Sequence, residues 1–347
     1  MLKHRITVRA STEYDVLIGK GLLEDASALI LEVHPACECV IVSDDTVYSI
    51  YGADLTKQLE AAGFTVGRFV FPHGEESKCT DTLLSALEAF HSAALTRSGL
   101  VIALGGGVVG DLAGLAASLY MRGTPFIQIP TTLLAAIDSS VGGKTAVNAP
   151  FGKNLIGAFH QPLRVICDPD TLSTLPHRIL CDGMAEAIKY GALESPSLLD
   201  SLSDSSFDMD DMIAECISIK ARVVEADELD LGLRAILNLG HTPAHAIEAL
   251  SGYTISHGQA VGIGLDIIAR ASVRLGADPS VSQRIAAALA ACELYAPCPF
   301  GAEELANSAR SDKKRKSDKI SLVLLKDIGA PYVHTVELDE LKGVLIP

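Results

Sequence analysis

The sequence predicts an α/β domain followed by a mainly helical domain. At 347 residues the chain is longer than one hydrophobic core usually serves. Short β-branched runs alternate with amphipathic stretches up to about residue 175, as in a layered domain with a largely parallel sheet. Beyond that point the apolar residues recur at helical spacing. We therefore expect a Rossmann-like α/β domain over residues 1–175 and a mainly helical domain over residues 176–347.

The individual elements follow from these periodicities, taken in chain order. The predicted strands of the first domain are residues 14–18, 39–43, 65–71, 100–104, 126–129 and 164–167. Amphipathic helices are expected over residues 55–62, 82–95 and 112–119. In the second domain we expect helices over residues 198–202, 212–224, 244–250, 260–275 and 280–294. Only residues 320–325 and 332–335 look extended there.

Composition excludes several classes of protein. Apolar residues make up 48% of the chain and charged residues 20%, which is typical of a globular protein. No apolar run approaches the length of a membrane span, and the N-terminus shows no apolar signal core. Eight scattered cysteines without a CxxC pair fit a reduced, cytoplasmic protein. A net charge of −15 disfavours a nucleic-acid partner, although an anionic small molecule could bind where cations are concentrated.

Three residues of the second domain have the chemistry of a metal site. Glu186, His241 and His257 offer one oxygen and two nitrogens, a set that suits an open catalytic zinc site. Both histidines lie beside glycines, which favours a site over three unrelated polar residues of a helical domain. The sequence lacks the HExxH motif at His241, so metalloprotease chemistry is disfavoured.

A glycine-rich segment of the first domain predicts a phosphate-binding turn. Residues 105–111, GGGVVGD, follow the predicted strand 100–104 and satisfy GxGxxG before a helix. No acidic residue lies about 20 positions further on, and consecutive glycines also permit close packing of a strand on a helix, so both interpretations stay open. Asp44, at the end of an earlier strand, could hold an adenosine ribose. Thr131 and Thr132, after a later strand, could donate hydroxyl hydrogen bonds.

A polar run over residues 138–148 and 152–154 is predicted to be an irregular binding loop, because it is rich in glycine. Lys144 and Lys153 lie in it; with Arg122 they suggest an anion site, although most lysines are simply solvated. Lys189 falls three residues after Glu186 on one helical face, which would place a phosphate beside the metal. We expect Thr242 to cap a helix, with His245 in its first turn as a proton-transfer group.

Several motifs together resemble the 3-dehydroquinate synthases of the sugar phosphate cyclase superfamily. They are GGGVVGDLAG, IPTTLLAAIDSSVGGKTAVN, FGKNLIGAFHQP, GMAEAIKYG, LRAILNLGHTPAHAIE and SHGQAVGIG, and the resemblance covers nearly the whole chain. It implies an NAD-binding α/β domain, a helical domain that binds zinc or cobalt, and a homodimer. The departures are Ala244, where the family usually has Gly, and Asp230, where it often has Glu. Neither removes a functional group.

The resemblance also assigns site residues. Its implied metal ligands are Glu186, His241 and His257. Its implied NAD contacts are Asp44, Gly74, Glu75, Lys78, Gly107, Val108, Val109, Gly110, Asp111, Thr131, Thr132, Lys144, Lys153, Thr171, Leu172, Ser173 and Thr174. Its implied substrate contacts are Arg122, Asp138, Lys144, Asn154, Lys189, Lys220, Arg234, Asn238, His245, His257 and a lysine of the Lys313–Lys314 pair. The catalytic roles fall to Lys144, Glu186, Lys189 and His245.

The reaction implied by the resemblance is a phosphate-eliminating cyclisation. The substrate would be 3-deoxy-D-arabino-heptulosonate 7-phosphate, oxidised transiently by NAD so that phosphate can leave, then reduced again and closed by an intramolecular aldol step to 3-dehydroquinate. A sister cyclase, such as 2-deoxy-scyllo-inosose synthase, would share the metal, NAD and Lys189. It need not retain the carboxylate-directed cations Lys220 and Arg234. A metal-dependent polyol dehydrogenase would have no use for the phosphate-binding set.

Overall fold

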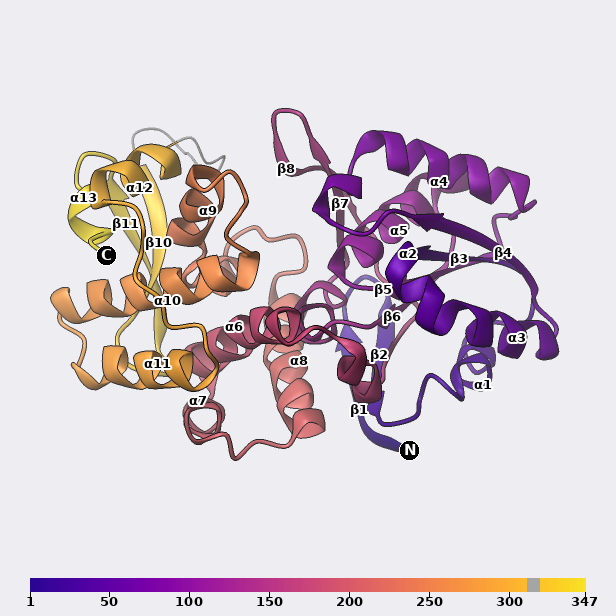
Figure 1. Ribbon diagram of the computed structural model, residues 1–347, viewed down its shortest axis with the longest axis horizontal. Coiled ribbons are helices and arrows are strands. Elements are labelled where there is room, and N and C mark those ends of the chain that lie inside the picture. The colour runs from indigo at the N-terminus through magenta and orange to yellow at the C-terminus, as the bar shows by residue number, and fades with distance from the viewer. Residues whose placement is uncertain (311–318) are drawn as a thin grey trace. The chain divides into compact units, whose positions relative to one another are not determined.

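The computed structural model describes residues 1–310 and 319–347. The chain divides into two compact units, Met1–Leu175 and Pro176–Pro347. The first unit is an α/β domain built on a mixed sheet, and the second unit is mainly helical, which confirms the predicted fold class (Figure 1).

A seven-stranded sheet forms the centre of the first unit, in the order β1-β2-β9-β6-β5-β3-β4. Its strands are β1 (Leu2–Arg9), β2 (Glu13–Gly19), β3 (Glu38–Asp44), β4 (Thr65–Phe71), β5 (Leu100–Gly105), β6 (Phe126–Pro130) and β9 (Arg164–Cys167). All neighbouring strands run parallel except β1, which pairs antiparallel with β2. The six predicted strands are confirmed, with their ends within two residues. The edge strand β1 was not among them.

Helices cover both faces of this sheet. They are α1 (Ala26–Leu31), α2 (Asp45–Val47), α3 (Ala53–Ala61), α4 (Thr80–Ser92) and α5 (Gly107–Leu119), with short helical turns η1 (Tyr48–Gly52), η2 (Glu75–Ser77), η3 (Tyr120–Arg122), η4 (Ala135–Ser139) and η5 (Pro169–Thr174). Alternate residues of one strand enter opposite cores: Val40 packs with α4 and α5, whereas Ile41 packs with α1 and α3. This two-sided burial explains why the strands read as continuous apolar runs.

A two-stranded hairpin corrects the predicted irregular loop. Strands β7 (Lys144–Ala149) and β8 (Gly152–Phe159) pair antiparallel, with Lys144 opposite Phe159. The glycines that suggested a loop lie at the positive-φ residues Gly142 and Gly143, just before β7. The hairpin packs on α5 because Gly114 has no side chain: a Cβ there would come 2.4 Å from the methyl carbon of Thr145.

The second unit consists of helices around α10, with one hairpin. Its elements are α6 (His177–Glu194), α7 (Pro196–Asp204), α8 (Met209–Ala226), η6 (Leu233–Asn238), α9 (His241–Leu250), α10 (His257–Arg274), α11 (Ser280–Ala291), α12 (Ala302–Ala309), β10 (Lys319–Leu325), β11 (Pro331–Glu337) and α13 (Leu341–Val344). Helix α10 packs against α6, α9, α11 and β10, so most of its surface is buried. The five predicted helices and both predicted strands are confirmed; α12 and α13 were missed, and α6 was expected only around Glu186 and Lys189.

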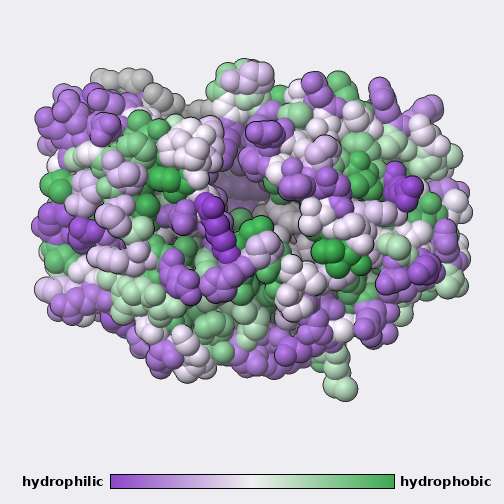
Figure 2. Space-filling view, in the orientation of Figure 1, coloured by the Kyte–Doolittle hydropathy of each residue, from purple (hydrophilic) through white to green (hydrophobic). Residues whose placement is uncertain are grey.

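Within the described residues, no helix combines the length and apolarity needed to cross a membrane. On the face seen in Figure 2, hydrophilic and hydrophobic residues are interspersed.

Candidate functional site

Three side chains from three helices of the second unit converge. Glu186 of α6, His241 of α9 and His257 of α10 present ligand atoms that all lie within 4.8 Å of one another. Glu186 Oε1 lies 3.4 Å from His241 Nε2 and 3.3 Å from His257 Nε2. Ligand bonds of about 2.0–2.1 Å at tetrahedral angles would separate nitrogen and oxygen by about 3.4 Å. The cluster therefore has the dimensions of a zinc site without any rearrangement of these pairs.

Two glycines of α10 allow the three helices to approach this closely. A Cβ at Gly258 would stand 2.2 Å from Cα of Asp182, on the α6 turn before Glu186. A Cβ at Gly264 would stand 2.2 Å from the carbonyl oxygen of Gly240, the residue before α9. Both contacts are with backbone, which a rotamer change cannot relieve. The glycines thus position the ligands, which explains why the motif SHGQAVGIG needs more than its histidine.

The start of α9 differs from the sequence prediction. The helix begins at His241, after Gly240 in the left-handed region at φ 78°, and Thr242 does not cap it. Glycine adopts this φ without the steric cost that a side chain would bring. Because the helix begins two residues earlier than expected, His241 lies in its first turn. His245 follows one turn later, and the two ring centroids are 5.6 Å apart.

Each histidine of the cluster has a partner for its other ring nitrogen. His241 Nδ1 lies 3.1 Å from the Leu239 carbonyl oxygen, which fixes Nδ1 as the protonated nitrogen and leaves the Nε2 lone pair toward Glu186. His257 Nδ1 lies 3.6 Å from Oε2 of Glu248, a buried carboxylate on α9. Carboxylate partners of this kind orient metal-binding imidazoles. Glu248 was not predicted, although it is an acidic residue one heptad after His241 and lies on the buried face of α9.

The buried charges of the cluster balance one another. Burial raises the pKa of Glu186, but Lys189 and the two histidines outweigh it and hold that pKa well below its usual value. Burial lowers the pKa of His241 more than Glu186 raises it, which keeps this imidazole neutral. Burial also lowers the pKa of His257, but Glu186 and Glu248 raise it to about 10. A cation between the three ligands would replace that proton, because metal binding requires neutral imidazoles.

Cationic side chains of the same unit come from mutually packed elements. Lys189 of α6 is buried and forms an ion pair with Glu186. Lys220 of α8 and Arg234 of η6 are also buried, and η6 packs against both α6 and α8. Asn238 ends η6, and its amide donates to the Ala235 carbonyl oxygen at 3.0 Å. Long cationic side chains are rarely buried without a charge-related role, so these elements together offer an anion-binding environment.

A single carboxylate orders the segment that carries Arg234. Asp227 accepts hydrogen bonds from the backbone N–H groups of Leu231, Gly232 and Arg234, at 2.8, 2.8 and 3.0 Å. The Arg234 guanidinium donates to the Glu228 carbonyl oxygen at 2.6 Å. These bonds lower the pKa of Asp227 and fold residues 227–234 into a compact turn. The role of Asp227 was not predicted, although its position at the end of a helical run, just before the loop that carries Arg234, could have indicated it.

In the first unit, polar groups gather at the carboxyl edge of the sheet. Strand β3 connects outward to β4, whereas β5 lies on the other side of β3, so the chain reverses direction between β3 and β5. Asp44 ends β3, and its carboxylate caps α2 through the Val47 N–H at 2.8 Å. Gly106 and Gly107 lie beyond the end of β5, at the start of α5. Such a reversal point is where open α/β sheets bind nucleotides.

The glycine-rich segment has two roles: one glycine allows close packing, and two others lie beside hydroxyl-bearing side chains. Helix α5 already begins at Gly107, so the expected loop is shorter than GxGxxG suggested. Gly110 is required for packing, since its Cβ would meet Gln128 Oε1 at 2.5 Å. Beside Gly106 and Gly107 lie Thr132 and Ser139. Among the described residues, the buried hydroxyls of Ser139 and of Thr131 make no hydrogen bond. Unpaired hydroxyls beside the first backbone N–H groups of a helix fit a phosphate-bearing ligand.

A second polar network joins four further predicted residues, Glu75, Lys78, Asp111 and Asn154. Buried Lys78 donates to Asp111 at 2.5 Å and to Asn154 at 2.7 Å. Asn148, which was not predicted, donates to Glu75 at 2.8 Å and accepts from the Asn154 N–H at 2.9 Å. The turn before α4, the start of α5 and the β7-β8 hairpin are therefore tied together.

The remaining predicted residues are distributed as follows. Gly74 is exposed at φ 107°, Val108 and Val109 lie in the first turn of α5, and Asp138 is half-buried in η4. Lys144 is exposed at the start of β7, and Lys153 is half-buried in β8. Thr171, Leu172, Ser173 and Thr174 form η5, where Tyr51 Oη lies 2.7 Å from Thr174 Oγ1. Lys313 and Lys314 lie outside the described residues.

Arg122 lies at the opposite end of α5 from the glycine-rich segment. It is exposed on η3, after α5 and before β6, at φ 67°. Helix α5 has 13 residues and is about 20 Å long, so it separates Arg122 from the glycines at its start.

Comparisons with known proteins identify the family of this chain. Residues 68–182 match the family described as 3-dehydroquinate synthase N-terminal, and residues 183–315 match 3-dehydroquinate synthase C-terminal. The chain is 43% identical to a 3-dehydroquinate synthase of Streptococcus suis over 95% of this chain and 96% of that protein. It is 41% identical to one of Streptococcus sanguinis, with 96% of each chain covered.

Solved structures show the same fold in related cyclases. A 2-deoxy-scyllo-inosose synthase, complexed with carbaglucose-6-phosphate, NAD+ and Co2+, is 26% identical with a TM-score of 0.89, and the match covers 99% of both chains. A 2-epi-5-epi-valiolone synthase of Streptomyces hygroscopicus, with NAD+ and Zn2+ bound, is also 26% identical, with a TM-score of 0.88 over 99% of this chain and 98% of that one. The near-complete match to curated relatives above 40% identity decides the assignment: the chain is an enzyme of the 3-dehydroquinate synthase family.

Proposed function

We propose that this enzyme converts 3-deoxy-D-arabino-heptulosonate 7-phosphate into 3-dehydroquinate and phosphate. The observation that carries the proposal is the Glu186, His241 and His257 cluster, in the same unit as buried Lys189, Lys220 and Arg234. This set suits a substrate that has both a phosphate and a carboxylate. Full-length similarity to 3-dehydroquinate synthases supports the same substrate.

NAD and a divalent metal, Zn2+ or Co2+, are the proposed cofactors. The residues fit both, because the cluster has tetrahedral ligand spacing and the sheet edge offers unpaired hydroxyls beside glycines. NAD would supply a reversible acceptor for a hydride, and the metal would acidify and polarise the oxygens at the reacting carbon. Asp44 is the proposed ribose ligand, and the start of α5 with Thr131 is the proposed pyrophosphate site.

The chain's own residues then bind and orient the substrate. Lys189 is proposed to hold the phosphate, and the family resemblance adds Lys144 and Asn154 as proposed phosphate contacts. Arg234 would bind the carboxylate through its planar guanidinium, with Lys220 and Asn238 on the ring hydroxyls. His245 would move the hydroxyl proton, and the phosphate itself would accept the proton that is lost during elimination.

We also propose a cytoplasmic homodimer. All eight cysteines are free, as expected of a protein that stays in a reducing compartment. The assembly is tested by light scattering during gel filtration, where a single peak at the monomer mass would contradict it.

The alternatives differ in substrate. Another sugar phosphate cyclase, such as 2-deoxy-scyllo-inosose synthase, would share most of the site, and the similarity in fold keeps it as the second candidate. Such an enzyme acting on a hexose phosphate would have no carboxylate for Arg234 to bind. A polyol dehydrogenase would leave Lys189 without a phosphate and Arg234 without a carboxylate.

The decisive experiment supplies the metal-loaded enzyme and NAD with either the heptulosonate phosphate or a hexose 6-phosphate. We expect phosphate release and dehydroquinate formation with the first substrate only, and no net accumulation of NADH. His245→Gln should abolish this activity, whereas His91→Gln, on the exposed end of α4, should not. Turnover of the hexose phosphate alone would favour the sister cyclases.

A further inference from the structure

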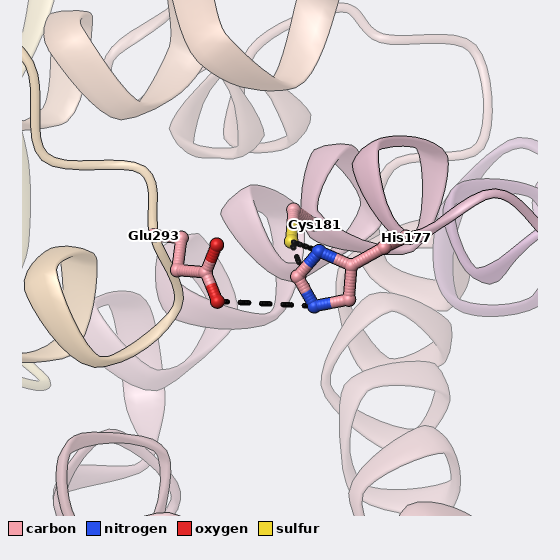
Figure 3. A group of neighbouring side chains, drawn as sticks. All are labelled: His177, Cys181 and Glu293. Atoms are coloured by element: carbon pink, nitrogen blue, oxygen red, sulfur yellow. Dashed lines mark hydrogen bonds and ion pairs between the residues drawn. The ribbon is translucent and has the colours of Figure 1, made fainter.

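A second group of metal-ligating side chains lies at the beginning of α6. His177 and Cys181 are four residues apart, so they share one face of the helix, and Glu293 follows α11 (Figure 3). Their ligand atoms lie within 4.8 Å of one another, as in the Glu186 cluster. In Figure 3 dashed lines join the imidazole to both the thiol and the carboxylate.

The distances suit one nitrogen of His177 as the central ligand. Its Nε2 lies 3.9 Å from Cys181 Sγ and 3.8 Å from Glu293 Oε1. In a tetrahedral zinc site these separations are about 3.6 Å for nitrogen to sulfur and about 3.4 Å for nitrogen to oxygen. Small rotations of exposed side chains close the difference, since His177 and Glu293 are both exposed.

The backbone holds Glu293 in an unusual conformation. Its φ is 59°, in the left-handed region just after α11, where helices commonly end in Gly or Asn. A glutamate there is sterically less favourable than glycine, and it directs a carboxylate toward His177. Backbone strain in a residue that completes a cluster of ligands points to a role for its side chain.

There is room for a hydrated cation beside these ligands. They line a cavity of about 180 Å³ together with Arg178, Asp182, Gln259 and Leu294. Asp182 adds a second carboxylate to the wall, which offsets the positive charge of Arg178. The carboxylate of Asp182 is itself bonded to Ser256 Oγ at 2.6 Å, so it adds negative charge without being one of the three ligands.

We propose that His177, Cys181 and Glu293 form a second site, which binds a thiophilic divalent cation such as Zn2+. Three protein ligands of sulfur, nitrogen and oxygen type leave one tetrahedral position for water. On binding, the Cys181 thiol loses its proton to solvent and its sulfur bonds to the metal, with no change of oxidation state. The ion would join the start of α6 to the segment after α11, and so stabilise the native state by mass action.

Cobalt provides a test that separates the two sites. The Glu186 cluster has no sulfur ligand, so Co2+ bound there cannot produce a thiolate-to-Co2+ charge-transfer band. Metal-free, full-length protein titrated with Co2+ should bind two equivalents and develop this band, and excess Zn2+ should remove it. Cys181→Ser should lose the band and one equivalent. Cys298→Ser, a half-buried cysteine of the same unit, should keep both.

Further variants keep the test independent of catalysis. Loss of an outer-shell partner alone typically costs about 10- to 100-fold in metal affinity, so His177→Ala should weaken the band-forming site at least tenfold. His241→Ala should lose the other equivalent and retain the band. Absence of the band in the wild-type protein, or its persistence in Cys181→Ser, would overturn the second site without affecting the proposed function.

Discussion

Gly264 of α10 lies directly against Gly240: a Cβ built at Gly264 would stand 2.2 Å from the Gly240 carbonyl oxygen. Gly240 precedes His241, and Gly264 is two turns after His257, so this contact sets the distance between the helices that carry both imidazoles. A residue without chemistry of its own therefore determines the geometry of the metal cluster.

Gly264→Ala should displace α9 from α10. Overpacking of this kind costs about 1–3 kcal/mol, because the clash is with backbone. We expect lower metal affinity along with a lower thermal midpoint. Gly343→Ala is the matched control, since a Cβ there meets nothing within 4 Å. Normal metal affinity in Gly264→Ala would show that the contact does not position His241.

His241→Ala and His257→Ala should each abolish activity and the retention of metal at the Glu186 cluster, since two remaining ligands cannot hold zinc in an open site. The amount of metal that remains bound at the Glu186 cluster after dialysis checks this prediction. Glu248→Gln removes only the negative charge beside His257 Nδ1 and should weaken binding by about 10- to 100-fold. Stoichiometric metal and full turnover in His257→Ala would contradict the ligand assignment.

Arg234→Ala should weaken binding of the heptulosonate phosphate much more than binding of NAD. Loss of a charge-assisted hydrogen bond costs about 1.5–3 kcal/mol. Calorimetry with each ligand separates the two effects. Arg222→Ala is the control, because Arg222 is exposed on α8 and pairs with Glu194. Equal losses for both ligands would indicate a folding defect instead of carboxylate recognition.

Residues 227–234 should loosen in acid. Three backbone hydrogen bonds lower the pKa of Asp227, so its stabilising contribution is present above the unfolded-state pKa of about 3.9 and is lost as pH falls through the lower folded-state value. Hydrogen exchange at the Leu231, Gly232 and Arg234 amides should show protection near pH 6 that Asp227→Ala lacks. Equal protection in the variant would mean that other contacts order this turn.

Asp44→Ala should weaken NAD binding, by about 1.5–3 kcal/mol if the carboxylate binds the ribose. Asp44→Asn keeps an oxygen to cap α2 but removes the charge, so it separates ribose recognition from local structure. We expect Asn to reduce the preference for NAD over NADP, because a carboxylate repels a 2′-phosphate. Fluorescence titration of both nucleotides measures this preference. An unchanged ratio would place the ribose elsewhere.

The sequence by itself determined the elements whose signal is local. Periodicity located the parallel strands and the long helices, because burial on both faces of a sheet or on one stripe of a helix is written into neighbouring residues. Motif chemistry also singled out Glu186, His241 and His257, whose convergence the fold then displayed. The β7-β8 hairpin was missed because its strands are stabilised by pairing with each other and by the space that Gly114 leaves on α5.

Only the tertiary structure decided which distant residues meet. Glu248 beside His257, Asp227 under Arg234, and Glu293 beside His177 depend on how helices pack, which no local pattern specifies. The same holds for Gly258 and Gly264, whose role is to let two backbones touch. Sequence names the groups that can do chemistry, whereas packing fixes their separations to a few tenths of an ångström, the scale on which metal binding and hydrogen bonding depend.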